Sequence, residues 1–188
     1  MAIAVAGVAG SGKSTLGRAL AASLALPLLD LDSLTNPLLD TFAESVLGGH
    51  WLASPHGRAI RDGRYAALRS TAHDVVRSAG GVVLVAPFTA ELSGGPEWQS
   101  LRDAVAPAGL QVLHLVGDDQ MFARRRAARA EVRDAHRPAD PPATERAGVH
   151  VPVLTIDASL TPAQQLHAAR HGLGLRDSGA QREVRRSR

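Results

Sequence analysis

The stretch GVAGSGKS, residues 7–14, decides the fold of this chain. It follows an apolar run, AIAVA at residues 2–6, and opens a segment of helical period at residues 12–25, in which Leu16, Leu20 and Leu24 share one face. The spacing G-x-x-x-x-G-K-S between a strand and a helix is that of a phosphate-binding loop. Backbone N–H groups and the positive end of the helix dipole can surround phosphate oxygens there. We therefore expect a nucleoside triphosphate at this loop; a glycine-rich turn without a ligand is the alternative.

Consecutive residues of the loop are expected to bind the nucleotide: Gly10, Ser11, Gly12, Lys13, Ser14 and Thr15. Lys13 is the only lysine among 21 basic residues, and all the others are arginine. A compact ammonium on a flexible stem can follow a transferred phosphate, whereas arginine has a planar fork suited to bidentate contacts. Lys13 is thus predicted to be catalytic, and the Ser14 hydroxyl is a predicted Mg²⁺ ligand. ATP and Mg²⁺ are the expected cofactors.

Length and composition indicate one α/β domain, predicted to span residues 1–175. The chain has 188 residues, of which 45% are hydrophobic and 21% charged, with a formal net charge of +3. Residues 176–188 are expected to be a basic, disordered tail, because QREVRRSR carries arginines without aromatic residues on which bases could stack. We therefore expect no nucleic-acid partner.

The absence of cysteine excludes disulfides and a cysteine nucleophile. No apolar run approaches the length of a membrane helix, and the first residues lack a basic leader. We expect a cytoplasmic protein without a membrane partner, acting as a monomer or homodimer on a small-molecule acceptor.

Apolar runs alternate with helical segments along the chain, which predicts a three-layer, doubly wound parallel sheet. The predicted strands are residues 2–7, 27–32, 81–88, 110–117 and 151–157. Residues 33–80 are too long for one crossover helix, and they contain two helical segments, 36–49 and 57–80. We interpret them as a substrate-binding insertion, and the proline-rich residues 130–149 as a lid.

The acidic residues lie at the end of the second predicted strand rather than the third, which ends VVLVAPF without an acid. Asp30 and Asp32 are two residues apart, so on a strand both would face the same side, toward the phosphate loop. We expect Asp32 to act as base and to bind the acceptor, and Asp30 to assist the metal through water. The reverse assignment stays open, as does a role for one of them in capping the following loop.

These motifs, together with the arginine-rich segment RRRAARAEVRD at residues 124–134, resemble the small P-loop kinases of the gluconate kinase and shikimate kinase group, which are related in fold to nucleoside monophosphate kinases. The resemblance extends over residues 1 to about 170, and the phosphate loop is its specific part. It implies the strand order 2-3-1-4-5, a substrate region after the second strand and a lid after the fourth.

The resemblance also implies a nucleotide site at two later segments. Arg125 would lie against the adenine, and Asp157 and Ala158, after the fifth strand, would border the adenine ring through their backbone. Arg129 would turn toward the lid and the phosphates, and Arg133 or Arg137 would supply the lid charge over the γ-phosphate. A solvated, arginine-rich helix face is the alternative for these arginines.

On the acceptor side, the resemblance implies an arginine before the third strand. Arg58, Arg61 and Arg64 are the candidates, and Phe88 at the end of that strand is expected to face the same crevice. Trp51 could stack on a sugar or a base, or could anchor the insertion against the core. Residues 86–95, APFTAELSGG, and 31–37, LDSLTNP, depart from the shikimate kinase and gluconate kinase patterns, which leaves the acceptor open.

The expected activity is ATP-dependent phosphoryl transfer to a hydroxyl of a small polar metabolite, such as a sugar or sugar acid. A nucleoside or nucleotide kinase, or a nucleotide-binding ATPase module without an acceptor, is the alternative.

Overall fold

The computed structural model of the chain describes residues 1–43, 45–129 and 148–175. Its sheet has five strands: β1 (Ala2–Ala6), β2 (Leu28–Asp30), β3 (Val82–Val85), β4 (Leu110–Val116) and β5 (Leu154–Asp157). All neighbouring strands pair in parallel, in the order β2-β3-β1-β4-β5. The predicted doubly wound sheet and its strand order are confirmed. Every residue of β1 is buried, as expected for a central parallel strand covered on both faces.

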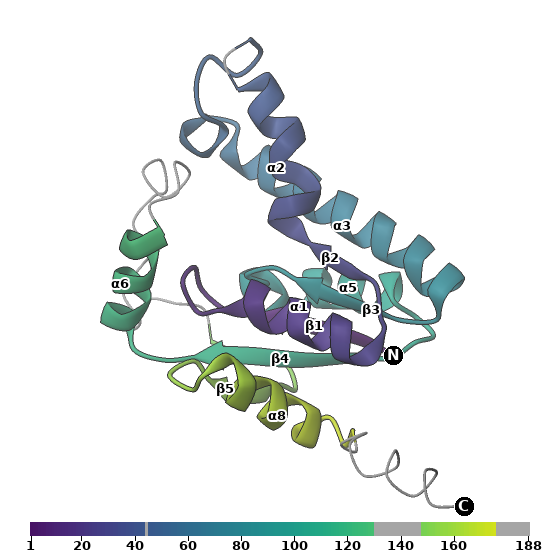
Figure 1. Cartoon of the computed structure of the whole chain (residues 1–188). Helices are drawn as coiled ribbons and strands as arrows, with labels where there is room; N and C mark the ends of the chain where they lie inside the picture. The colour runs from purple at the N-terminus through teal and green to yellow at the C-terminus, as the bar shows by residue number, and fades with distance from the viewer. Residues whose placement is uncertain (44, 130–147, 176–188) are drawn as a thin grey trace, which may run out of the picture.

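Helices cover both faces of the sheet, as Figure 1 shows. On one face, Ile3 and Val5 of β1 pack with Leu16 and Leu20 of α1 (Lys13–Leu24), beside α8 (Pro162–Gly172). On the other face, the alanines of β1 pack with Leu68 of α3 (Gly57–Ala79) and with α5 (Pro96–Ala104). The two faces alternate along the strand with period two. The result is the predicted three-layer architecture.

The segment after β2 differs from the sequence prediction. β2 ends at Asp30, and α2 (Leu31–Phe42) begins at once, so the predicted strand 27–32 is too long and the predicted helix 36–49 starts too late. The Asp30 carboxylate accepts a hydrogen bond from the Asp32 backbone N–H at 3.0 Å and caps α2, and Pro37 lies inside the helix. The expectation that Asp30 and Asp32 share one side of a strand is therefore wrong, because Asp32 lies in the first turn of α2.

The remaining elements are a short helix in the insertion between β2 and β3 and two helices that follow the carboxyl ends of β3 and β4. They are the short helix η1 (Trp51–Ala53), α4 (Thr89–Leu92) after β3, and α6 (Asp119–Arg129) after β4. In Figure 1, α2 rises on one side of the loop that precedes α1, and α6 stands on its other side. Within the described residues, none of the helices has the length and apolar character needed to cross a bilayer.

Candidate functional site

The phosphate loop runs from Gly7 to Ser14 between β1 and α1, and its glycines allow its shape. Gly10 and Gly12 have φ values of 84° and 96°, in the left-handed region that side chains disfavour. A Cβ added to Gly10 would lie 2.6 Å from the carbonyl oxygen of Phe122, so the loop packs tightly against α6. Arg126 of α6 donates a hydrogen bond to the carbonyl oxygen of Ala9 at 2.8 Å. Sequence analysis missed Arg126, since its neighbours in the arginine run look alike.

The polar groups of the loop suit an anionic ligand. The N-cap of α1 is Gly12, which offers no side chain to the first N–H groups of the helix. Lys13 Nζ donates to the Val8 carbonyl oxygen at 3.3 Å and thus reaches back over the loop. The Ser11 hydroxyl is buried without a hydrogen-bond partner in the described part of the chain. Ser14 lies in the first turn of α1, next to the exposed Thr15.

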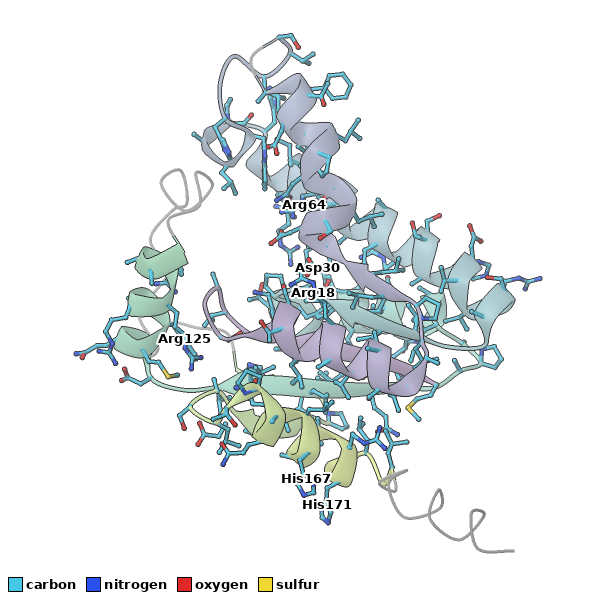
Figure 2. The ribbon with its side chains drawn as sticks, viewed as in Figure 1. Arg18, Asp30, Arg64, Arg125, His167 and His171 are labelled. Carbon is cyan, nitrogen blue, oxygen red and sulfur yellow. The ribbon has the colours of Figure 1, made fainter. Side chains whose placement is uncertain are left out.

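In the region predicted to bind the acceptor, Asp32 is held by an arginine of the neighbouring helix. Arg64 Nη2 lies 2.6 Å from Asp32 Oδ1, and it also donates to Asn36 Oδ1 at 2.9 Å. Its Nε donates to Thr35 Oγ1 at 2.8 Å. The Arg64 side chain is 13% exposed and that of Asp32 is 37% exposed. Asp32 and Arg64, both predicted site residues, are therefore 32 positions apart in sequence and form an ion pair with each other. Figure 2 labels Arg64 beside the lower turns of α2, Asp30 below that helix, and Arg125 beside α6 on the other side of the phosphate loop.

Trp51 anchors the insertion. The residue is 4% exposed, and its indole Nε1 donates to Asp40 Oδ1 of α2 at 2.9 Å. The Arg64 guanidinium carbon lies 4.7 Å from the centroid of the Trp51 ring, and the His50 ring stacks on it at 5.5 Å. Of the two roles left open for Trp51, these contacts favour the anchor.

A second set of side chains in contact joins α3 to the segment where α4 follows β3: Arg61, Tyr65, Phe88 and Glu91. The Tyr65 hydroxyl accepts a hydrogen bond from the Phe88 backbone N–H at 3.0 Å, and Phe88 has a φ of 52°, unusual for a large side chain. Arg61 lies 4.5 Å over the Tyr65 ring, and its Nη2 is 3.8 Å from Glu91 Oε2. Glu91 is only 2% exposed, and burial raises the pKa of its carboxyl group. Burial also raises the pKa of the Tyr65 hydroxyl.

The third candidate arginine has a different environment. Arg58 has a side chain that is 97% exposed and lies 3.9 Å from Asp62 on the same helix. Sequence analysis placed Arg61, Arg64 and Phe88 near one another, and the structure brings them to the same region. It missed Glu91, because a glutamate after an apolar strand looks like an ordinary surface residue of a helix.

A hydrogen bond joins the two segments expected at the adenine, which are α6 and the loop after β5. Arg125 Nη1 donates to the Ala158 carbonyl oxygen at 3.0 Å, and Gln165 Nε2 donates to the same oxygen at 3.2 Å. The Asp157 carboxylate accepts from the Ser159 backbone N–H at 2.7 Å, and this bond lowers the pKa of Asp157. Arg125 thus lies beside the loop after β5. A contact with adenine stays a prediction for these residues.

The predicted lid falls almost wholly outside the described residues. Arg129 is the last residue of α6. Arg133, Arg137 and the rest of the segment 130–147 lie beyond the described part of the chain.

Within the described residues there is no cluster of three or more histidines and carboxylates that could hold a metal ion by itself. The candidate ligands for Mg²⁺ are Ser14 on α1 and Asp30, which is 7% exposed at the end of β2. A hydroxyl and a carboxylate are hard oxygen donors, which suit Mg²⁺ when nucleotide phosphates complete its coordination.

Comparison with known proteins supports the fold. A gluconokinase from Sinorhizobium meliloti 1021 has a TM-score of 0.57 and 22% identity, covering 100% of this chain and 97% of that one. Shikimate kinase from Aquifex aeolicus vf5 also has a TM-score of 0.57, with 14% identity over 93% of this chain and 96% of that one. The APS kinase CysC of Mycobacterium tuberculosis, in complex with AMPPNP and APS, has a TM-score of 0.57 and 20% identity, covering 92% and 96%.

No curated protein matches the sequence significantly. A family model described as the AAA domain matches residues 3–146, most of the chain and all of the phosphate loop. The chain belongs to this AAA domain family, and its fold is that of the small P-loop kinases.

Proposed function

We propose that the protein is a kinase that transfers the γ-phosphoryl group of ATP to a hydroxyl of a small polar metabolite, such as a sugar or sugar acid. One observation carries the proposal: the phosphate loop with Lys13 follows β1, and Asp30 ends β2 and Asp32 follows it, at the same edge of one parallel sheet. Ligands of open parallel sheets bind at this edge. A phosphate-binding loop near a carboxylate is the arrangement that phosphoryl transfer to a hydroxyl requires.

Each residue has a distinct role in this proposal. Lys13 balances the charge of the transferred phosphoryl group. Asp32 orients the acceptor hydroxyl and takes its proton, and Arg64 holds the Asp32 carboxylate in place through their 2.6 Å contact. Ser14 and Asp30 would hold Mg²⁺, which when bound neutralises phosphate charge.

The arginines of the nucleotide side complete the proposed site. Arg125 would contact the adenine beside Ala158, and Arg129 and Arg133 would bring positive charge to the phosphates. APS kinase has a similar fold and its structure contains AMPPNP, which supports a nucleoside triphosphate as the donor.

Two contacts make a nucleoside acceptor less suitable than a sugar-like one. A nucleoside pocket needs an aromatic face for the base. The Trp51 ring is already in contact with Arg64 and His50, and Tyr65 is 5% exposed, with its hydroxyl bonded to Phe88.

The direct test is ATP consumption with a panel of sugars, sugar acids, amino alcohols and nucleosides. We expect at least one small polar metabolite to raise turnover well above slow hydrolysis. If none does, the kinase proposal is refuted in favour of a nucleotide-binding module.

Two variants assign the roles. Lys13→Met should abolish transfer and leave the free energy of unfolding nearly unchanged. Asp32→Asn should lower kcat much more than it weakens nucleotide binding, and Asp74→Asn, which changes an 80% exposed carboxylate on α3, should leave kcat unchanged. An Asp32→Asn protein with normal kcat would refute the role of Asp32 as base.

A further inference from the structure

The arginines expected to contact the acceptor each lie beside a carboxylate. The closest contacts are Arg64 with Asp32 at 2.6 Å, Arg61 with Glu91 at 3.8 Å, and Arg58 with Asp62 at 3.9 Å. An arginine that recognises an acidic ligand uses its positive charge for that ligand. Here the charge of each candidate is already balanced within the protein.

Arg64 has the most contacts with other side chains among the three arginines. Its guanidinium bonds Asp32, Thr35 and Asn36 and packs over the Trp51 ring. A carboxylate or phosphate on the acceptor would have to compete with Asp32 for this guanidinium. It would also place a second negative charge next to Asp32, which repels it.

Arg61 lies beside a buried carboxylate. Its Nη2 and Glu91 Oε2 are both buried and have no hydrogen-bond partner in the described part of the chain, while the Arg61 side chain as a whole is 38% exposed. An anion that approaches the exposed part of Arg61 would also meet Glu91 and Asp62, whose Oδ1 is 3.8 Å from Arg61 Nη1. Repulsion by these carboxylates offsets the attraction of the guanidinium.

A neutral hydroxyl compound has the complementary chemistry. A hydroxyl donates one hydrogen bond and accepts others, so it can interact with a carboxylate and a guanidinium at the same time. A carboxylate or phosphate can only accept hydrogen bonds from the guanidinium, and it offers no hydrogen-bond donor to the neighbouring carboxylate.

We propose that the acceptor of this kinase is an uncharged hydroxyl compound, a sugar or polyol, rather than a carboxylate or phosphate. The inference rests on the kinase function proposed above and names the substrate class of the same site. Arg61 and Arg64 act in it as positioning residues that hold Glu91 and Asp32, and not as receptors for an anion.

The first experiment measures ATP consumption with matched pairs of acceptors: sorbitol with gluconate, glucose with glucuronate, and glycerol with glycerate. We expect a neutral member to be phosphorylated with a kcat/KM at least ten times that of its acid partner. A higher kcat/KM for an acid member overturns the inference and leaves the kinase function standing. No turnover above that of Lys13→Met with any acceptor overturns the kinase function, and the inference with it.

The second experiment changes the carboxylate beside Arg61. Glu91→Gln keeps the shape of the side chain and frees the charge of Arg61, so kcat/KM for the acid member should rise about tenfold relative to the neutral one, about 1.4 kcal/mol. The matched control is Asp74→Asn on α3, where the carboxylate is 80% exposed and the ratio should not change. An unchanged ratio in Glu91→Gln overturns the inference.

A third variant keeps the test valid if Glu91→Gln does not fold. In Arg61→Gln the ratio of neutral to acid turnover should change less than threefold, because Arg61 does not bind an anion. A selective loss of tenfold or more with the acid member would show that Arg61 binds its carboxylate, and would overturn the inference.

Discussion

The pair formed by Arg64 and Asp32 can be tested by its contribution to stability, independently of any ligand. Arg64→Met keeps most of the aliphatic stem and removes the guanidinium, which bonds Asp32, Thr35 and Asn36 and covers Trp51. Hydrogen bonds to a charged group contribute about 1.5–3 kcal/mol each in favourable cases. Asp32 is 37% exposed and regains water in the variant, and Thr35 keeps its own bond to the Leu31 carbonyl oxygen. We therefore expect a total loss of about 3 kcal/mol, less than the sum of the separate bonds.

The matched assay is urea unfolding of four proteins: wild type, Arg64→Met, Asp32→Asn and the double variant. Asp32→Asn alone should cost about 1 kcal/mol, since an amide still accepts a hydrogen bond. The double variant should be less destabilised than the sum of the singles by about 1–2 kcal/mol, the coupling expected for residues in direct contact. The melting temperature of Arg64→Met should fall by roughly 6–12 °C for a domain of this size.

The control is Arg58→Met on the same helix, whose exposed ion pair should contribute within about 0.5 kcal/mol of zero. Additive effects of Arg64→Met and Asp32→Asn, or a loss in Arg64→Met no larger than in the control, would refute the reasoning. In that case Arg64 would be available to bind a ligand.

Three further predictions concern packing and pH. Gly17→Ala places a Cβ against Val85 of β3. Alanine is preferred over glycine in a helix by about 1 kcal/mol, but overpacking should still lower the stability by about 1–2 kcal/mol net. Adding Val85→Ala to this variant should restore the stability measured in thermal melts. Tyr65→Phe leaves the buried Phe88 N–H unpaired and should cost about 1–3 kcal/mol in urea unfolding; no loss would mean that this N–H finds another acceptor. Burial lowers the pKa of His114 below its usual 6.5. The neutral His114 ring therefore contributes its full stability to the fold above pH 6.5, and this stability is lost as the pH falls from 6.5 through the lowered pKa. His114→Gln should flatten the decrease in stability measured between pH 7.5 and 5.

The strands could be predicted because their signals are local, and their order followed from the resemblance to the small P-loop kinases. Each strand is a short apolar run, and the phosphate loop identifies itself by glycine and lysine spacing within eight residues. The start of α2 could not be predicted in this way. The sequence pattern placed a helix at residues 36–49, whereas the Asp30 carboxylate caps a helix that begins at Leu31, five residues earlier.

The contacts of the acceptor side could not be read from the sequence, because they join distant segments. The Arg64 to Asp32 pair spans 32 positions, and Arg61, near the start of α3, pairs with Glu91, which follows β3. The resemblance to small kinases predicted these arginines at the acceptor but said nothing of their partners. The Arg126 bond to the phosphate loop spans 117 positions and left no local signal.

Helix geometry explains why three evenly spaced arginines differ so much in availability. At about 100° per residue, a step of three residues turns a side chain back by about 60° around the helix axis. From Arg58 through Arg61 to Arg64 the side chain therefore turns from solvent toward α2, and its exposure falls from 97% to 38% to 13%. Burial of a guanidinium demands a carboxylate partner, and the partners follow the same order of closeness. The less exposed arginines, Arg61 and Arg64, are thus the ones nearest the proposed site and also the ones whose charge is most fully balanced. In a chain with one lysine and many arginines, proximity to the site is therefore poor evidence for an acidic ligand unless the neighbouring carboxylates are counted as well.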